Sequence, residues 1–161
     1  MMEHRIIEGI FMVSKCEYCQ LDGGYGELIH ETDCWKIFLA PSQRYLGTCV
    51  VALKRPCKNL AELETCEWAD FAETVKKLEG SLDEAFKPTL YNWSCFKNAS
   101  FRNESPNPEV HWHFIPRYKT KVEFAGISFE DPDFGYIPQP VEKRVLDEVM
   151  VKIKAEILKN L

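Results

Sequence analysis

The hydrophobic positions of this chain change period along its length, and each period predicts a different element. Residues 34–40 (CWKIFLA) and 47–54 (GTCVVALK) are rich in β-branched and aromatic side chains, which is typical of strands. Residues 60–86 place their apolar side chains near helical spacing, which predicts one long amphipathic helix. The first half of the chain therefore combines a strand pair with a helix.

Capping and breaking residues set the expected ends of this helix. Asn59 is the expected N-cap, because its side-chain oxygen can accept a hydrogen bond from an unpaired N–H of the first turn. Glu62 stands three residues later, as the second half of a capping box does. Pro88 cannot continue a helix, so we expect the helix to end just before it.

The second half of the chain repeats this mixture. Residues 90–98 and 109–117 read as two further strands, joined by a polar loop rich in asparagine and proline that suits a ligand site. Residues 122–136 show no regular period and are expected to be irregular. Residues 141–160 place apolar side chains at helical spacing, which predicts a C-terminal helix. Strands and helices that do not alternate strictly indicate an α+β fold.

Two of the four histidines stand two residues apart in the strand predicted over residues 109–117. Side chains alternate between the two faces of a strand, so Glu109, His111 and His113 are expected on one face. The opposite face then carries the apolar residues Val110, Trp112 and Phe114. Because imidazole titrates near neutral pH and can bind metal or handle phosphate, one face of this strand is a candidate site and the other is core.

Composition and charge narrow the class of protein. The chain has 161 residues, 45% of them hydrophobic, which suits a single globular domain over residues 1–161. The net charge of −5 and the absence of a dense basic cluster argue against nucleic acid as a partner. No apolar run approaches the roughly 20 residues of a membrane span and no signal peptide is recognisable, so we expect a cytoplasmic protein with no membrane partner. Seven dispersed cysteines, an odd number, favour reduced thiols over a disulfide framework.

Several local matches, taken together, resemble the histidine triad (HIT) superfamily. Its signature is His-x-His-x-His followed by two apolar residues, and residues 109–115 read EVHWHFI. Cys16-x-x-Cys19 is similar to the N-terminal cysteine pair of many members, and residues 47–55 (GTCVVALKR) resemble a strand written Gly-His-x-Leu-Val-Ile-Pro-Lys-Arg. Asn98 matches an asparagine that precedes the histidine strand at this distance.

The resemblance covers residues 16 to about 138 and implies both a fold and an activity. It implies a HIT-like α+β fold, with an antiparallel sheet, a long helix and a C-terminal helix, and with the sheet continued across a homodimer. Members bind a nucleotide and hydrolyse it, or transfer its nucleotidyl group, at the α-phosphorus. The implied substrates are adenine nucleotides, either dinucleoside polyphosphates or nucleoside phosphoramidates.

The same resemblance assigns roles to single residues. His111 would be the nucleophile that forms a nucleotidyl-histidine intermediate, which needs a neutral imidazole whose far nitrogen is hydrogen-bonded, commonly to a carbonyl. His113 would donate to phosphate oxygens as charge builds in the transition state. No metal is expected at this catalytic centre. The implied substrate contacts are Asn98 and Ser105 at the phosphate or the leaving group, Phe38 in the base pocket, and Gln43 at the ribose.

Three positions depart from the family pattern. Glu109 stands where the first histidine of the triad is expected, and it adds negative charge beside a phosphate site. Ala40 replaces the usual ribose-binding acid, and Thr48 replaces the histidine of the Gly-His strand. These changes leave open a second hypothesis, a nucleotide-binding or sensing module with little catalysis.

A structural zinc ion is another expectation that the resemblance raises. In members with the Cys-x-x-Cys pair, two histidines complete the zinc site, and Glu109 and Pro56 occupy their positions here. Tetrahedral zinc accepts thiolate and carboxylate, so the candidate ligands are Cys16, Cys19, Cys57 and Glu109. Two alternatives stay open: the cysteine pair holds no metal, or the chain is a zinc-held interaction domain with no nucleotide site.

Overall fold

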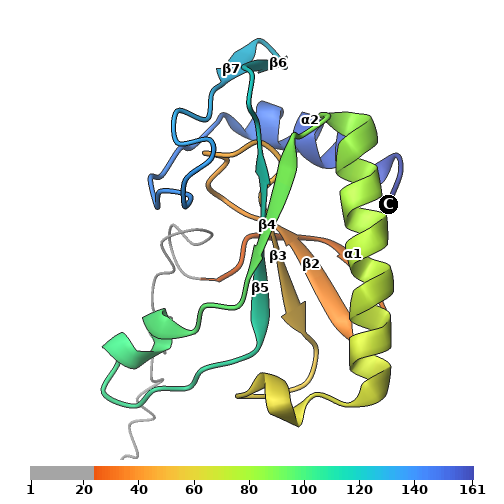
Figure 1. Ribbon diagram of the computed structural model, residues 1–161, viewed down its shortest axis with the longest axis vertical. Helices are drawn as coiled ribbons and strands as arrows, with labels where there is room; N and C mark the ends of the chain where they lie inside the picture. Colours follow the sequence, from red (N-terminus) through yellow and green to blue (C-terminus); the bar gives the residue numbers. More distant parts are fainter. Residues whose placement is uncertain (1–23) are drawn as a thin grey trace, which may run out of the picture.

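Five antiparallel strands form one sheet, and the long helix lies along one of its faces (Figure 1). The computed structural model describes residues 24–161. In chain order the strands of this sheet are β1 (Glu27–Glu31), β2 (Trp35–Leu39), β3 (Cys49–Leu53), β4 (Leu90–Ser94) and β5 (His111–Arg117). Their order across the sheet is β1-β2-β3-β5-β4, so β5 pairs with β3 on one side and with β4 on the other.

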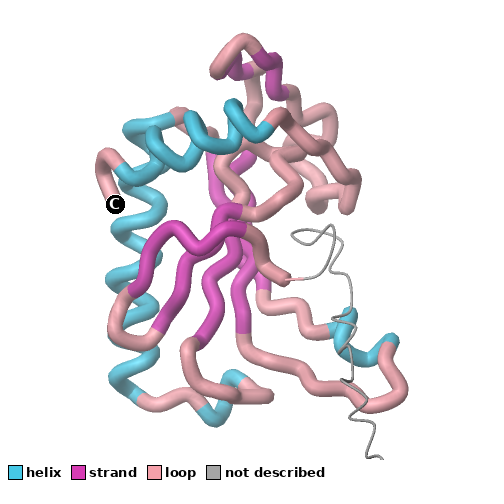
Figure 2. Tube along the Cα trace, turned by 180° about the vertical axis from the view of Figure 1, so that it is seen from behind, coloured by secondary structure: helices cyan, strands magenta, loops and turns pink. Residues whose placement is uncertain are grey.

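The two α-helices pack together, and α2 (Asp147–Leu158) crosses near one end of α1 (Thr65–Ala85) (Figure 2). The core between these helices and the sheet includes helix residues from both, namely Leu78, Leu82, Val149, Ile153 and Ile157. The Ser81 hydroxyl joins the helices by donating to the Ile157 carbonyl at 2.5 Å. Within residues 24–161, neither helix combines the length and the apolar character of a membrane span.

The four strands and two helices expected from the sequence are all present, which confirms the α+β class. The strands are somewhat shorter than expected, and residues Asn98–Arg102 form a 3-10 helix, η2, after β4. The C-terminal helix, expected over residues 141–160, begins only at Asp147. The sheet has β1 and β4 as its edges, and its continuation across a homodimer stays a prediction.

Three strands were not expected. The edge strand β1 buries only Ile29, so its sequence carries no apolar pattern. The segment expected to be irregular begins with a two-stranded hairpin of β6 (Val122–Phe124) and β7 (Ile127–Phe129). Its turn residues Ala125 and Gly126 have φ angles of 51° and 79°, the left-handed pair that a tight hairpin turn requires.

The expected start of the long helix is wrong. Residues Leu60–Glu62 form only a short 3-10 helix, η1, and the α-helix begins at Thr65. The side chain of Asn59 does not cap a backbone N–H. Its amide instead donates to the Glu62 carboxylate at 2.7 Å. A capping residue thus identified a turn next to the helix rather than the helix itself.

The helix start is determined by a capping box one turn further on. Glu64 is the N-cap, and the Glu67 carboxylate accepts from its backbone N–H at 2.8 Å. Arg55, just after β3, donates to both oxygens of Glu67, at 2.5 and 2.8 Å. These hydrogen bonds lower the pKa of Glu67, so the carboxylate stays charged. The end of the helix before Pro88 is as expected, since Ala85 is its last residue.

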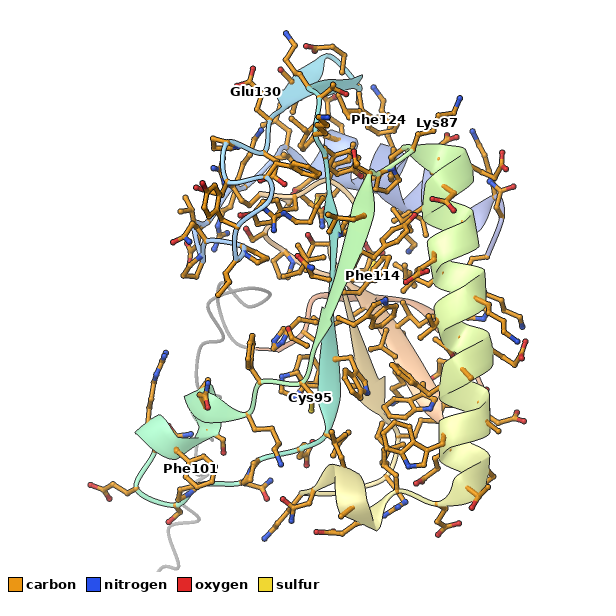
Figure 3. The ribbon with its side chains drawn as sticks, viewed as in Figure 1. Lys87, Cys95, Phe101, Phe114, Phe124 and Glu130 are labelled. Carbon is orange, nitrogen blue, oxygen red and sulfur yellow. The ribbon has the colours of Figure 1, made fainter. Side chains whose placement is uncertain are left out.

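Aromatic packing fills the space between the sheet and α1. The Phe71 ring of α1 stacks on Trp112 with centroids 4.9 Å apart, and it meets Trp93 at 5.5 Å and Trp35 at 5.1 Å. Phe114 points to the same side, toward the helix (Figure 3). This is the apolar face that alternation along β5 predicts. Because the helix occupies this face, the other face of the sheet is left for a site.

A buried ion pair anchors the chain on that other face. Arg117, at the end of β5, is buried and donates to both carboxylate oxygens of Asp131, at 2.6 and 3.0 Å. Its guanidinium also donates to the carbonyls of Asp133 and Tyr136, at 2.7 and 2.8 Å, and to the Asn92 side chain at 3.2 Å. A buried charge of this kind is tolerated because it is fully paired. These bonds hold residues 131–136 against the end of the sheet.

Candidate active site

The face of the sheet opposite α1 carries the paired histidines. His111 and His113 lie on β5 and are 8% and 0% exposed. The neighbouring strand β3 places Ala52 opposite His111 and Val50 opposite His113. On the other side, Ser94 of β4 is opposite His113. The flanking residues, on the two strands that pair with β5, are therefore an alanine, a valine and a serine.

The chain just before β5 orients the imidazole of His111. Its Nδ1 lies 2.8 Å from the carbonyl oxygen of Glu109. A carbonyl oxygen can only accept, so Nδ1 carries the proton of the neutral ring and Nε2 keeps its lone pair. This is the hydrogen bond that a nucleophilic histidine needs.

Glu109 contributes to the site through its backbone rather than its side chain. Strand β5 begins at His111, so Glu109 precedes the strand, whereas the expected strand included it. Its side chain is exposed. Water and ions screen an exposed carboxylate, which weakens its repulsion of a phosphate.

Aromatic rings stand on both sides of the histidine pair. The rings of His111 and His113 meet edge to face, with centroids 4.9 Å apart. Tyr25 lies 4.9 Å from His111, and Phe96 lies 6.1 Å from His113. Sequence reasoning missed both aromatic residues, because no motif marks either of them. Tyr25 is far from β5 in the sequence, and Phe96 lies at the start of the β4–β5 loop.

A glycine allows Tyr25 to reach this face. Gly26 has φ +110°, and a Cβ on it would come within 2.1 Å of the Leu39 carbonyl oxygen, so only glycine permits the close approach of this segment to β2. The Tyr25 ring then lies 5.6 Å from Phe38 of β2. We call this pair the Tyr25–Phe38 wall. Phe38, expected in the base pocket, thus lies in an aromatic wall that continues to His111.

The loop between β4 and β5 carries the expected contacts to the phosphate or the leaving group. Asn98 begins η2 and Ser105 follows it, and both residues are exposed. Cys95 lies where this loop leaves β4, and Phe101 lies farther out on the loop (Figure 3). Burial raises the pKa of the Cys95 thiol, so this cysteine is neutral at physiological pH.

Gln43 has a different environment from the one expected of a ribose contact. The side chain is fully buried. Its amide nitrogen donates to the carbonyls of Ala40 and Thr48, at 2.8 and 3.1 Å, and its oxygen accepts from the Gly47 N–H at 2.8 Å. Gln43 therefore closes the loop between β2 and β3, and its polar atoms are bound within the chain.

A pocket of about 190 Å³ lies between the end of β3 and the start of β5, and its lining includes Cys57 and Glu109. The buried Cys57 thiol donates to the Asn59 carbonyl at 3.3 Å. Two of the four expected zinc ligands thus share one pocket, while Cys16 and Cys19 lie outside the described residues. Over residues 24–161, no three side chains of histidine, cysteine, aspartate or glutamate are grouped as a metal site requires.

No family model and no curated protein matches this chain. Its structure does match solved structures. A hypothetical histidine triad nucleotide-binding protein from Sulfolobus tokodaii is 19% identical with a TM-score of 0.60, and the match covers 84% of this chain and 83% of that one. A Zn-bound histidine triad family protein from Mycobacterium smegmatis is 15% identical with a TM-score of 0.52, over 82% and 84% of the two chains. This chain has the histidine triad fold.

A uridylyltransferase shares the HIT fold as well. It is 22% identical with a TM-score of 0.53, and the match covers 84% of this chain but 42% of that one. The fold expected from the resemblance is therefore confirmed. At these identities the likeness concerns the fold, so the chemistry has to be argued from the residues of this chain.

We predict that His111 of the free protein is the Nδ1–H tautomer, because the Glu109 carbonyl can bind only a protonated nitrogen. The nitrogen-15 shifts of the imidazole ring distinguish a protonated ring nitrogen from an unprotonated one. His30 on the edge strand β1 is the internal control, since it is a second imidazole observed in the same spectra. A neutral His111 with its proton on Nε2 would contradict the proposed orientation of the nucleophile.

Proposed function

We propose that this protein is a nucleotide hydrolase or nucleotidyl transferase that acts at the α-phosphorus through a nucleotidyl-His111 intermediate. The observation that carries the proposal is the 2.8 Å hydrogen bond from His111 Nδ1 to the Glu109 carbonyl, which leaves Nε2 with a lone pair beside His113. The HIT fold supports it, because one protein with this fold is described as nucleotide-binding and another as a uridylyltransferase.

The first step is a displacement at phosphorus. The Nε2 lone pair of His111 attacks the α-phosphorus, and the phosphorus–nitrogen bond forms while the bond to the leaving group breaks. The ring then carries a positive charge, because Nδ1 keeps its proton. The Glu109 carbonyl accepts from that N–H and stabilises the charge.

The second step releases the nucleotide. Water or another acceptor attacks the same phosphorus, the phosphorus–nitrogen bond breaks, and neutral His111 is regenerated while the proton of the acceptor passes to solvent. His113, edge to face with His111, is the proposed donor to the phosphate oxygens in both steps. The chemistry requires no metal at His111.

The substrate is proposed to lie across the histidine face. The Tyr25–Phe38 wall takes the adenine base, and Asn98 and Ser105 on the β4–β5 loop contact the phosphate or the leaving group. Ala40 is buried and apolar, so the ribose has to be recognised without the acid that the family pattern contains. The proposed substrates are dinucleoside polyphosphates or nucleoside phosphoramidates.

Replacing the nucleophile tests the proposal. His111→Ala should lower the release of nucleoside monophosphate from these substrates by at least about 10³-fold, because no other group supplies the attacking nitrogen. Chromatography of the products measures the release, and calorimetry checks that the variant still binds nucleotide. The matched control is His30→Ala, which removes a histidine from the edge strand β1 and should leave turnover unchanged.

The outcomes separate the hypotheses. Turnover retained in His111→Ala would refute the proposed nucleophile. Tight nucleotide binding by the wild type without any product over hours would favour a binding or sensing module instead. Absence of both binding and turnover would favour an interaction domain.

We also propose one structural zinc ion. Cys57 and Glu109, a thiol and a carboxylate in one pocket, are donors that zinc accepts, and Cys16 and Cys19 are proposed to complete the four ligands. A related protein with this fold is described as Zn-bound. A closed four-ligand shell would support the fold and take no part in the reaction.

Metal analysis of the purified protein should give about one zinc per chain, since a tetrahedral site of four protein ligands holds one ion. Cys57→Ser should lower this content and the thermal unfolding temperature. The matched control is Cys66→Ser on α1, an exposed cysteine away from the pocket, which should change neither. Wild-type protein free of zinc would contradict the site.

A further inference from the structure

The aromatic ring of Phe96 stands beside the histidine pair without being part of the core. Phe96 is 46% exposed, yet its ring lies 6.1 Å from that of the fully buried His113. It belongs to the same loop as Asn98 and Ser105, the residues proposed to contact the leaving group. The ring therefore adds apolar, planar surface at the edge of the proposed reaction centre.

The order of the strands places the aromatic groups on opposite sides of β5. The Tyr25–Phe38 wall reaches the histidines from the β2 side, whereas Phe96 reaches them from the β4 side, and β5 lies between. A nucleoside held at the wall would place its α-phosphorus at His111. With the first nucleoside at the wall on the β2 side, the rest of the substrate can extend from His111 toward His113 and the β4 side, where Phe96 is exposed.

We propose that Phe96 forms a stacking site for the second base of a dinucleoside polyphosphate, on the leaving-group side of His113. The inference rests on the proposed function and selects one of its two substrate classes. Any of the bases can stack on an aromatic side chain, because every base has a π-face. A small inorganic phosphate or an aliphatic amine has no such face and would gain nothing from the ring.

The experiment compares two substrates that differ only in the second nucleoside. The probes are diadenosine tetraphosphate and adenosine 5′-tetraphosphate, assayed with wild type and with Phe96→Ala. We expect Phe96→Ala to raise the KM for the dinucleoside about 10-fold, within the usual range for removing a base–aromatic stack, and to leave the KM for adenosine tetraphosphate unchanged. Phe96→Tyr keeps the ring and should restore the wild-type KM.

A second aromatic residue of the same loop supplies the matched control. Phe101 is 65% exposed and lies farther out on the loop (Figure 3), so Phe101→Ala removes a similar apolar area without removing a ring next to His113. It should leave both KM values unchanged. An effect of Phe96→Ala that is absent, or equal for the two substrates, would overturn the stacking site.

Binding measurements keep this inference separate from the proposed activity. In the His111→Ala background, calorimetry should show tighter binding of the dinucleoside than of adenosine tetraphosphate, and the added Phe96→Ala change should remove the difference. If no variant turns over either substrate, the proposed activity fails, while this difference still supports the stacking site. Equal binding of the two probes would overturn the stacking site even in an active enzyme.

Discussion

Strand β5 has to meet opposite demands on its two faces, and the alternation of its side chains meets both. Trp112 and Phe114 pack toward α1, while His111 and His113 lie on the opposite face of the sheet. A slip of one residue in register would exchange the faces and place imidazoles against the aromatic cluster around Phe71. The core and the candidate site therefore depend on the same pairing of β5 with β3 and β4.

The orientation of His111 by a backbone carbonyl changes how the unusual triad position is understood. The atom that binds the imidazole is the carbonyl oxygen of Glu109, which any residue at that position would supply. The side chain there is exposed, and it lines the pocket that also contains Cys57. Glutamate in place of histidine is thus compatible with the geometry that a nucleophile at His111 needs.

The parts of the fold that follow from a repeated apolar period could be predicted from the sequence. The strands β2, β3, β4 and β5 were predicted from short runs rich in β-branched and aromatic residues, and both helices were predicted from apolar side chains at helical spacing. The edge strand β1 and the hairpin of β6 and β7 bury few side chains, so they leave no such pattern. The helix start was misplaced because two overlapping signals competed, and the box of Glu64 and Glu67, tied to Arg55 by tertiary contacts, prevailed.

Some residues of the candidate site could be predicted from the sequence and others could not. The histidine pair was found because both residues lie in one short motif. Tyr25 was missed because it joins the site only through the close approach of a distant segment at Gly26. Phe96 was missed because no motif distinguishes it from the other aromatic residues near β4. Gln43 was assigned to the ribose from its place in the sequence, yet in the folded chain its amide closes a loop. Residue type alone could not separate these two uses of one side chain.

A nucleotidyl-His111 intermediate can be tested by trapping it. Wild-type protein mixed briefly with a dinucleoside polyphosphate and denatured in alkali, which preserves a phosphorus–nitrogen bond, can be digested and analysed by mass spectrometry. We expect one nucleoside monophosphoryl group, attached to His111. A nucleotidyl group on any other residue, or steady product formation with no modified histidine at any time, would contradict it.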